Sequence, residues 1–309
     1  MILTVTLNPS IDRRYFVKDF HKDKVFRTNE VQYTPGGKGL NVSRVINKFK
    51  EPVIATGVLG GLSGQFIIEK LDELEIENDF VKIKANTRSC IAILSDDESQ
   101  TEILEPGPKI SQNELGDFYK TYEKLVDKSE IICGSGSIPQ NAPVDIYKRL
   151  IEIAREKNKK FILDTSGETL REGIKASPYM IKPNEEELES IIGHSINTER
   201  ELLEAIKGIQ EYGVKLIIVS LGAEGSVVCY EDKTYKVEAP KIKAINPVGS
   251  GDSMVAGIAV GLSRGYDFEK MIKLATSCGT ANAMEKETGK VNINNVEKLM
   301  EEVKMVRIG

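Results

Sequence analysis

The stretch Asn246-Pro-Val-Gly-Ser-Gly-Asp252-Ser-Met-Val-Ala-Gly257 decides the fold class of this chain of 309 residues. Pro247 ends the preceding strand, because proline cannot donate to a buried sheet ladder, and the glycines then allow a tight turn. An apolar pattern of helical period begins at once, with Met254 and Val255. A strand, a glycine turn and a helix in this order predict an α/β fold with an anion site at the positive end of the helix.

Gly249, Ser250 and Gly251 are the candidate anion-binding residues of this turn, and Asp252 is the candidate general base. Converging N–H groups could stabilise a phosphoryl group as its charge develops, while the carboxylate accepts a proton from an attacking hydroxyl. An aspartate here is also a common helix N-cap, and the turn by itself leaves both interpretations open. The chain lacks GxxxxGK[ST] and lacks a GxGxxG after a strand, so neither a P-loop nor a dinucleotide fold is predicted.

A second glycine turn, Thr34-Pro-Gly-Gly-Lys38-Gly-Leu-Asn41, also precedes a helical pattern. Gly37 lets a ligand approach the backbone closely, and Lys38 and Asn41 offer donors that suit a sugar hydroxyl or a phosphate. A structural turn with a solvated lysine is the alternative. Two such turns in one chain favour a site for a small polar ligand.

Short apolar runs alternate with helical patterns along the rest of the chain, which predicts βαβ units around a mostly parallel sheet. The predicted strands are 2–7, 53–59, 130–133, 160–164, 179–182 and 215–221, and the predicted helices are 41–49, 64–74, 144–157, 185–192, 199–212 and 253–263. Residues 12–33 and 86–104 read instead as strands with turns, forming a small antiparallel sheet. We interpret this sheet as a lid over the site; two ordinary surface hairpins are the alternative.

Composition narrows the classes of function. A net charge of -5 gives no global basic field, so nucleic-acid binding is not expected. The N-terminus lacks a signal-peptide pattern, no apolar run is long enough to span a membrane, and the four cysteines form no CxxC pair, which together predict a cytoplasmic protein. With only His21 and His194, a His-based triad or a multi-His zinc site is nearly excluded.

GGKGLNVSRV, which begins at Gly36, and NPVGSGDSMVAGIAVG, which begins at Asn246, together resemble the two signature segments of the ribokinase and phosphofructokinase-B family of sugar kinases. Further landmarks follow in the expected order: Asn8–Asp12, Thr87-Arg88, Gly134-Ser-Gly-Ser137, Asp164-Thr-Ser, Lys182-Pro-Asn184-Glu-Glu-Glu187 and Ser220-Leu-Gly222-Ala-Glu-Gly225. The match spans essentially the whole chain, and the ordered set is highly specific. It implies one ribokinase-like, three-layer α/β/α domain over residues 1–309, with a mostly parallel central sheet and a β-sheet lid.

The resemblance also implies a role for each matched residue, with ATP and Mg²⁺ as nucleotide and metal. In the catalytic group, Asp252 is the general base, and Gly249, Ser250 and Gly251 form the anion hole. In the sugar group are Asp12, Gly37, Lys38, Asn41 and Ser137. In the nucleotide group are Lys182, Asn184, Ser220, Gly222, Gly225 and, on the adenine side, Asn282, while Asn184 and Glu187 order Mg²⁺ through water. The alternative for Asn184 and Glu187 is a plain helix cap with a solvated acid in the first turn.

Arg27 and Arg88 fall in the lid-like stretches, where a core needs neither. A guanidinium fork suits a phosphate, so we expect an acceptor that already carries one; solvent-facing arginines are the alternative. Within the family, the subgroup that acts on phosphorylated ketohexoses resembles this pattern. The favoured reaction converts tagatose 6-phosphate to tagatose 1,6-bisphosphate, and fructose 1-phosphate and fructose 6-phosphate remain open as acceptors.

Three rival functions are weighed against a sugar-phosphate kinase. A non-catalytic sugar or nucleotide sensor could keep the same fold, but it has little use for Asp252 beside an anion turn. A ribose or nucleoside kinase requires no phosphate-binding arginines. An NAD-dependent dehydrogenase shares the α/β rhythm but needs the missing fingerprint. A lid sheet with one apolar face further predicts a homodimer formed through the lid.

Overall fold

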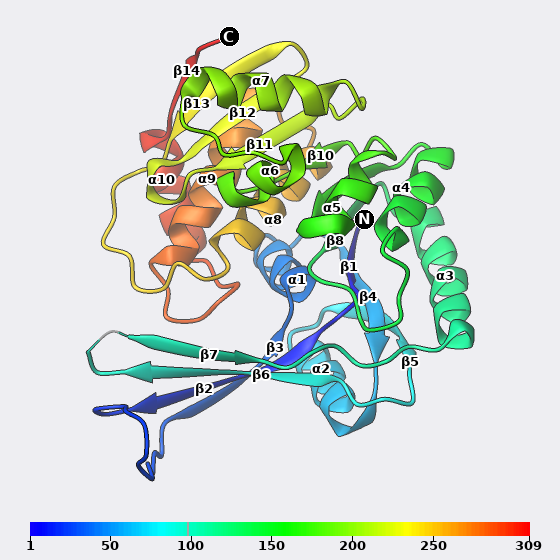
Figure 1. Ribbon diagram of the computed structural model, residues 1–309, viewed down its shortest axis with the longest axis vertical. Helices are drawn as coiled ribbons and strands as arrows, with labels where there is room; N and C mark the ends of the chain where they lie inside the picture. The colour runs from blue at the N-terminus through cyan, green and yellow to red at the C-terminus, as the bar shows by residue number, and fades with distance from the viewer. Residues whose placement is uncertain (98) are drawn as a thin grey trace.

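A ten-stranded sheet forms the middle layer of the computed structural model, which describes residues 1–97 and 99–309 (Figure 1). Its strand order is β14-β13-β12-β11-β10-β9-β8-β1-β4-β5. The parallel strands are β1 (Ile2–Thr6), β4 (Val53–Leu59), β5 (Glu77–Lys82), β8 (Ile131–Ser135), β9 (Lys160–Asp164), β10 (Met180–Ile181) and β11 (Leu216–Ser220). An antiparallel edge follows, made of β12 (Ser226–Tyr230), β13 (Lys233–Glu238) and β14 (Lys304–Arg307). The predicted mostly parallel sheet is confirmed.

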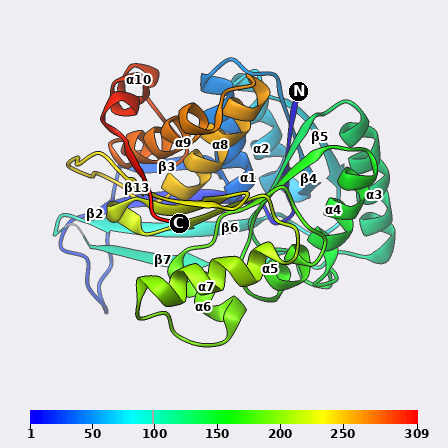
Figure 2. The same ribbon diagram turned by 90° about the horizontal axis from the view of Figure 1, so that it is seen from above.

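Helices cover both faces of this sheet, which confirms the three-layer α/β/α class (Figure 2). One face carries α1 (Lys38–Lys48), α2 (Gly61–Glu73), α8 (Ser250–Ser263), α9 (Phe268–Ala283) and α10 (Ile293–Glu302). The other carries α3 (Gln112–Asp127), α4 (Ile146–Glu156), α5 (Gly167–Ile174), α6 (Glu185–Ile192) and α7 (Glu199–Gln210). The sequence patterns did not predict α3, α5 or the antiparallel edge. None of the described helices has the length and apolar character needed to cross a membrane.

A separate four-stranded sheet lies beside the main body, in the order β3-β2-β6-β7 (Figure 1). Its strands are β2 (Ser10–Val17), β3 (Val31–Gly36), β6 (Arg88–Ser95) and β7 (Gln100–Leu104), so they fall in or next to the two predicted lid stretches. Position 98 of the second stretch lies outside the described residues. The outer pairs are antiparallel as predicted, whereas the central pair, β2 and β6, is parallel because both strands run outward from the main sheet.

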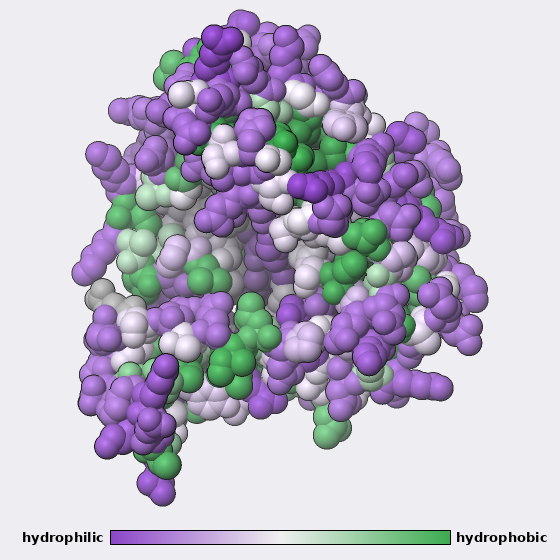
Figure 3. Space-filling model, in the orientation of Figure 1, coloured by the Kyte–Doolittle hydropathy of each residue, from purple (hydrophilic) through white to green (hydrophobic). Residues whose placement is uncertain are grey.

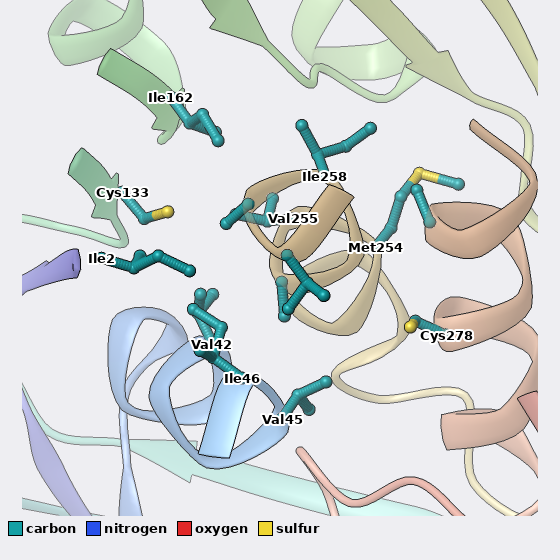
Figure 4. Packing of buried hydrophobic residues seen from close by; sticks show 14 of the residues in the cluster. Ile2, Val42, Val45, Ile46, Cys133, Ile162, Met254, Val255, Ile258 and Cys278 are labelled. Carbon is teal, nitrogen blue, oxygen red and sulfur yellow. The ribbon is translucent and has the colours of Figure 1, made fainter. Parts of the chain in front are cut away.

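Helix α8 occupies the centre of the apolar packing (Figure 4). Its residues are buried almost all round, which is typical of a helix enclosed between a sheet and a second helix. Val255 and Ile258 lie opposite Ile162 of β9, and Val42 and Ile46 of α1 complete the same cluster. This packing fixes α1 and α8 side by side, with the two glycine turns at their N-termini.

Gly257 tests the packing of α8 on α9. A Cβ atom at Gly257 would lie 2.6 Å from Cα of Ala275, a backbone atom that cannot move independently. We expect Gly257→Ala to lower the free energy of unfolding in a urea titration, because overpacking costs about 1–3 kcal/mol. That cost exceeds the roughly 0.5–1 kcal/mol that alanine gains over glycine in a helix.

Gly208→Ala is the matched control, since Gly208 lies in α7 and a Cβ there would meet no described atom within 4 Å. This variant should be slightly more stable than the parent, by roughly 0.5–1 kcal/mol. Equal stability of the two variants would contradict the close approach of α8 and α9.

Candidate active site

A cavity of about 330 Å³ lies between the carboxyl ends of β1, β8 and β9 and the small sheet, where Figure 3 shows the molecular surface hollowed. The carboxyl ends of parallel strands are the usual binding edge of such sheets. Residues of the main domain and of the small sheet line the cavity. They include Thr6, Asn8, Ser10, Asp12, Arg13, Arg14, Gly37, Lys38, Arg88, Cys90, Glu102, Ser135, Ser137, Thr165 and Thr288. The small sheet therefore forms one wall of a pocket, which the alternative of isolated surface hairpins does not explain.

Four of these lining residues carry a buried polar atom without a hydrogen-bond partner among the described residues. The atoms are Thr6 Oγ1, Asn8 Oδ1, Arg13 Nε and Ser135 Oγ. Unpaired buried polar atoms are rare in folded proteins, because each one forfeits its hydrogen bonds to water. Their gathering around one cavity indicates a site for a polar ligand.

Asp252 lies in the first turn of α8 and is buried, with 6% of its surface exposed. Burial, together with the nearby charge of Asp164, raises the pKa of its carboxyl to about 6, while Lys38 and Lys182 and a hydrogen bond act in the opposite direction. A carboxylate with this pKa is well suited to accept a proton near neutral pH. Gly249 is the N-cap of α8, so the N-cap interpretation of Asp252 is not supported.

Asn41 holds Asp252 in place. Its Nδ2 donates to Asp252 Oδ2 at 2.7 Å, and its Oδ1 accepts a hydrogen bond from Arg44. Asn41 is only 5% exposed. Both ends of the amide are thus bonded within the protein, and Asn41 orients the carboxylate. The predicted contact with a sugar hydroxyl stays a prediction, because the NH₂ group has a second N–H to donate.

The glycine turn before α8 has the geometry of an anion site. Gly249 has φ of 85°, in the left-handed region that favours glycine. The N–H of Ser250 donates to the carbonyl of Pro247 at 3.2 Å, so it is partly occupied. In the described part of the chain the N–H groups of Gly251 and Asp252 have no backbone acceptor, and they start the helix, where its dipole attracts negative charge.

Two lysines and Asp164 form a charged cluster next to this turn. Lys38 Nζ lies 3.2 Å and Lys182 Nζ 3.6 Å from Asp164 Oδ1. Asp164 raises the pKa of Lys38, and although burial alone would raise the pKa of Asp164, the two lysines lower it. Lys182 also packs on the turn, since its Nζ is 2.9 Å from where a Cβ of Gly251 would be. The cluster thus places two lysine side chains beside the anion site.

Three residues that were predicted to bind the sugar lie on the cavity wall and have hydrogen-bond partners within the protein. Asp12 accepts from Ser10 Oγ at 2.7 Å, and burial raises the pKa of Asp12, against the effects of that bond and of nearby arginines. Arg88 donates to the carbonyl oxygens of Asn8 and Glu105. Ser137 Oγ accepts from Asn8 Nδ2 at 3.0 Å, and Gly37 lines the same wall.

Arg27 lies apart from this group. It is exposed in the connection between β2 and β3 and does not line the cavity of its own chain. Arg13 and Arg14, which the sequence reasoning did not select, do line it. The sequence signal that could have found them is their place directly after Asp12 in one strand, where Arg14, two residues on, shares the face of the strand with Asp12.

The nucleotide-side predictions divide into two groups. Asn184 and Glu187 form a capping box at the start of α6, so the helix-cap interpretation is correct as far as their mutual contacts go. Ser220 pairs with Asn184 in an isolated bridge, and Gly222 is exposed, with open space around it. We call Asn184, Glu187, Ser220 and Gly222 the rim. The bridge between Asn184 and Ser220 joins its two chain segments, and Asn184 is two residues after Lys182.

Gly225 and Asn282 are structural. Gly225 is buried, and a Cβ there would lie 2.0 Å from the carbonyl oxygen of Val237. Asn282 has no exposed surface; its Nδ2 donates to the carbonyl of Val248 at 2.9 Å and its Oδ1 accepts from the N–H of Gly289 at 2.9 Å. The predicted contact of Asn282 with adenine is therefore not supported, because this side chain supports the anion turn from behind.

Comparison with known proteins agrees with this arrangement. Residues 5–294 match the model of the pfkB family carbohydrate kinases. A Staphylococcus aureus protein provisionally named phosphofructokinase is 31% identical, with 100% of this chain and 99% of that chain covered and a TM-score of 0.86. Escherichia coli phosphofructokinase-2, in complex with potassium, is 25% identical with 97% and 98% covered and a TM-score of 0.90.

A Thermotoga maritima protein described as a possible 1-phosphofructokinase is 26% identical, with both chains covered in full and a TM-score of 0.91. The fold, including the small second sheet, is thus shared along the whole chain. Since the family model matches far more than half of the sequence, this chain belongs to the pfkB family of carbohydrate kinases.

Proposed function

We propose that this kinase uses ATP to phosphorylate a ketohexose that already carries one phosphate, with tagatose 6-phosphate as the favoured acceptor and tagatose 1,6-bisphosphate as the product. The observation that carries the proposal is the buried Asp252 in the anion turn, which directly follows Val248, a residue that lines the same cavity as three arginines. The cavity residues Arg13, Arg14 and Arg88 match an anionic acceptor. The relatives named as phosphofructokinase and 1-phosphofructokinase support fructose 6-phosphate and fructose 1-phosphate as second candidates.

In this proposal the phosphates of ATP lie along the rim from Asn184 to the anion turn. The fit rests on two observations: the N–H groups of Gly251 and Asp252, which have no acceptor among the described residues, and the Nζ of Lys182, which packs against Gly251. Mg²⁺ keeps much of its water shell, so a single carboxylate such as Glu187, with Asn184 beside it, suffices to hold it through water. When bound, Mg²⁺ neutralises part of the phosphate charge.

The reaction then requires one proton transfer by the protein. Asp252 takes the proton of the acceptor hydroxyl, whose oxygen forms a bond to the γ-phosphorus of ATP while the bond to the β-phosphate oxygen breaks and ADP leaves. The N–H groups of the turn and the two lysines stabilise the transferring phosphoryl group. The small sheet, as a lid, excludes water that would otherwise act as the acceptor.

The protein's setting is also part of the proposal. The four cysteines are free, in accord with a cytoplasmic location. The small sheet exposes Tyr33, Ile103 and Leu104, which are 49%, 55% and 63% exposed and could be covered in a homodimer. Sedimentation velocity at micromolar concentration should show a dimer that Leu104→Lys weakens; a monomer at all concentrations would contradict this assembly.

The proposed substrate is tested by a coupled ADP-release assay that compares kcat/KM for tagatose 6-phosphate, fructose 1-phosphate, fructose 6-phosphate and ribose. We expect a clear preference for a phosphorylated ketohexose, with tagatose 6-phosphate first. A preference for ribose would overturn the substrate class, and no turnover with any acceptor would favour the sensor.

The same assay on Arg88→Gln tests the phosphate contact. Loss of a charge-assisted hydrogen bond is worth about 1.5–3 kcal/mol, so kcat/KM for the phosphorylated acceptor should fall by roughly 10- to 150-fold. Arg27→Gln is the comparison, because Arg27 does not line the cavity of its own chain. Equal losses for the phosphorylated sugar and for ribose would show that Arg88 supports the loop at Asn8 and not the phosphate.

Asp252→Asn should lower kcat by about 10²–10⁴-fold and leave the KM values for both substrates within about threefold, because general-base help acts only in the transition state. For the parent enzyme, kcat/KM should rise with pH through about 6, since only the deprotonated carboxyl accepts a proton and burial has raised its pKa to about 6. The variant should lose this acid limb. A parent-like rate in the variant would remove Asp252 from the chemistry.

A further inference from the structure

Arg44 is a buried arginine that the proposed reaction does not use. It lies on α1, one helical turn after Asn41, and is 8% exposed. Burial lowers the pKa of its guanidinium, against the raising effects of Glu287, Asp12 and Asp252, and its Nε has no partner among the described residues. Placing a charge this deep is unfavourable unless it makes several hydrogen bonds, so its contacts call for an explanation.

The Nη2 group of Arg44 joins two segments that are far apart in the sequence. It donates to Asn41 Oδ1 at 2.5 Å and to the carbonyl oxygen of Thr288 at 2.9 Å. Its Nη1 lies 3.9 Å from Glu287 Oε1. Because an amide whose oxygen accepts from Arg44 must present its NH₂ on the other side, the bond fixes Asn41 so that Nδ2 points at Asp252.

The segment 286–288 receives a second arginine, from the small sheet. Arg14 of β2 donates to the carbonyl oxygen of Lys286 at 2.6 Å and to Thr288 Oγ1 at 2.5 Å. Asn246, just before the anion turn, also donates to the carbonyl oxygen of Lys286 at 3.2 Å. One short segment is thus bonded to the small sheet, to α1 and to the approach to α8.

We propose that Arg44 is a positioning residue for the general base, and that residues 286–288 link it to the small sheet through Arg14. The chain of contacts runs from Arg14 to Thr288, then to Arg44, Asn41 and Asp252. When the small sheet contacts the main domain, Arg14 bonds Thr288, and the carbonyl oxygen of Thr288 accepts from Arg44. Arg44 then orients Asn41, so that Asn41 donates to the carboxylate of Asp252. Closure of the sheet over a sugar and readiness of Asp252 are coupled by this chain.

The proposal rests on Asp252 as the base of the proposed kinase, so one readout is chosen that needs no turnover. Carboxyl ¹³C NMR of aspartate-labelled protein, with the Asp252 signal assigned from Asp252→Asn, follows the ionisation of Asp252 directly. The charged groups that face this carboxyl are Asp164, Lys38, Lys182 and Arg44. None of the first three is altered in the variants below.

Arg44→Met removes the fork and keeps an unbranched side chain. It should raise the pKa of Asp252 by about one unit, because a positive charge and an oriented donor are both lost. Because only the deprotonated carboxyl accepts a proton, the higher pKa of Asp252 moves the acid limb of the kcat/KM profile to higher pH. Activity should be roughly tenfold lower below pH 6 and nearly equal to the parent above pH 8.

Arg44→Lys separates positioning from charge, and it also serves if Arg44→Met does not fold, as judged by circular dichroism. Lysine keeps the charge but has a single nitrogen in place of the fork. Positioning predicts that it leaves most of the shift in place. Full return of the pKa to the parent value would show that charge alone acts, and would overturn the positioning role.

Arg14→Met tests the link to the small sheet. It should shift the same pKa in the same direction by less, and the double variant with Arg44→Met should shift it no further than Arg44→Met alone, because the two residues act on one path. Arg264→Met is the control: Arg264 pairs with Glu51 at the far end of α8 and should leave the pKa unchanged.

The outcomes are distinguishable from failure of the proposed function. An unchanged Asp252 pKa in both Arg44 variants would overturn the positioning role even in a fully active kinase, and additive shifts in the double variant would remove the link through Arg14. If the Asp252 pKa shifts as expected but the protein phosphorylates no sugar, the hydrogen-bond network from Arg14 to Asp252 is supported and the proposed reaction is overturned.

Discussion

The packing of α1 against α8 is the constraint on which the rest of the structure depends. The two helices share one apolar cluster over the sheet, and their N-termini carry the two glycine turns. Asn41 and Asp252, which are 211 residues apart in the sequence, become hydrogen-bonded neighbours only because of this packing. A displacement of either helix would therefore separate the amide from the carboxylate. The apolar core and the geometry of the candidate site are thus not independent properties of this chain.

Electrostatic balance is the second constraint. Asp252 and Asp164 are both buried, and Asp164 raises the pKa of Asp252. Lys38 and Lys182 lie on Asp164, so the cluster of two acids and two lysines is nearly neutral without a ligand. Buried charges persist when they are paired and hydrogen-bonded, whereas a lone one would neutralise itself by a shift in pKa. An arriving phosphate would meet two lysines that Asp164 holds in place, beside Asp252, whose pKa is raised to about 6.

The sequence was sufficient to predict many turns, helices and strands, but not the hydrogen bonds between residues that are far apart in the chain. The turn before α8 and the parallel strands could be predicted because their signals lie within a few residues, as with Pro247, Gly249 and the apolar period after Asp252. The capping box at the start of α3, formed by Ser111 and Glu114, is likewise a local signal, three residues apart in the sequence. By contrast, the fate of Asn41 depends on Arg44 and Thr288, and the fate of Asn282 on Val248 and Gly289. The residue type gives the hydrogen-bond donors and acceptors of a side chain. Whether these groups are already bonded within the protein depends on the fold.

The attachment of the small sheet follows from its unusual pairing. β2 leaves the body directly after β1, and β6 leaves it after the strand β5, so the two central strands run outward together as a parallel pair. At their base, Arg88 of β6 donates to the carbonyl oxygen of Asn8, just before β2, which ties both departure points to one guanidinium. The base of the sheet is held where both strands leave the body, and Arg14 bonds its outer part to residues 286–288. An outward movement of this part would break the Arg14 contacts, which lead through Thr288, Arg44 and Asn41 to Asp252, the proposed base.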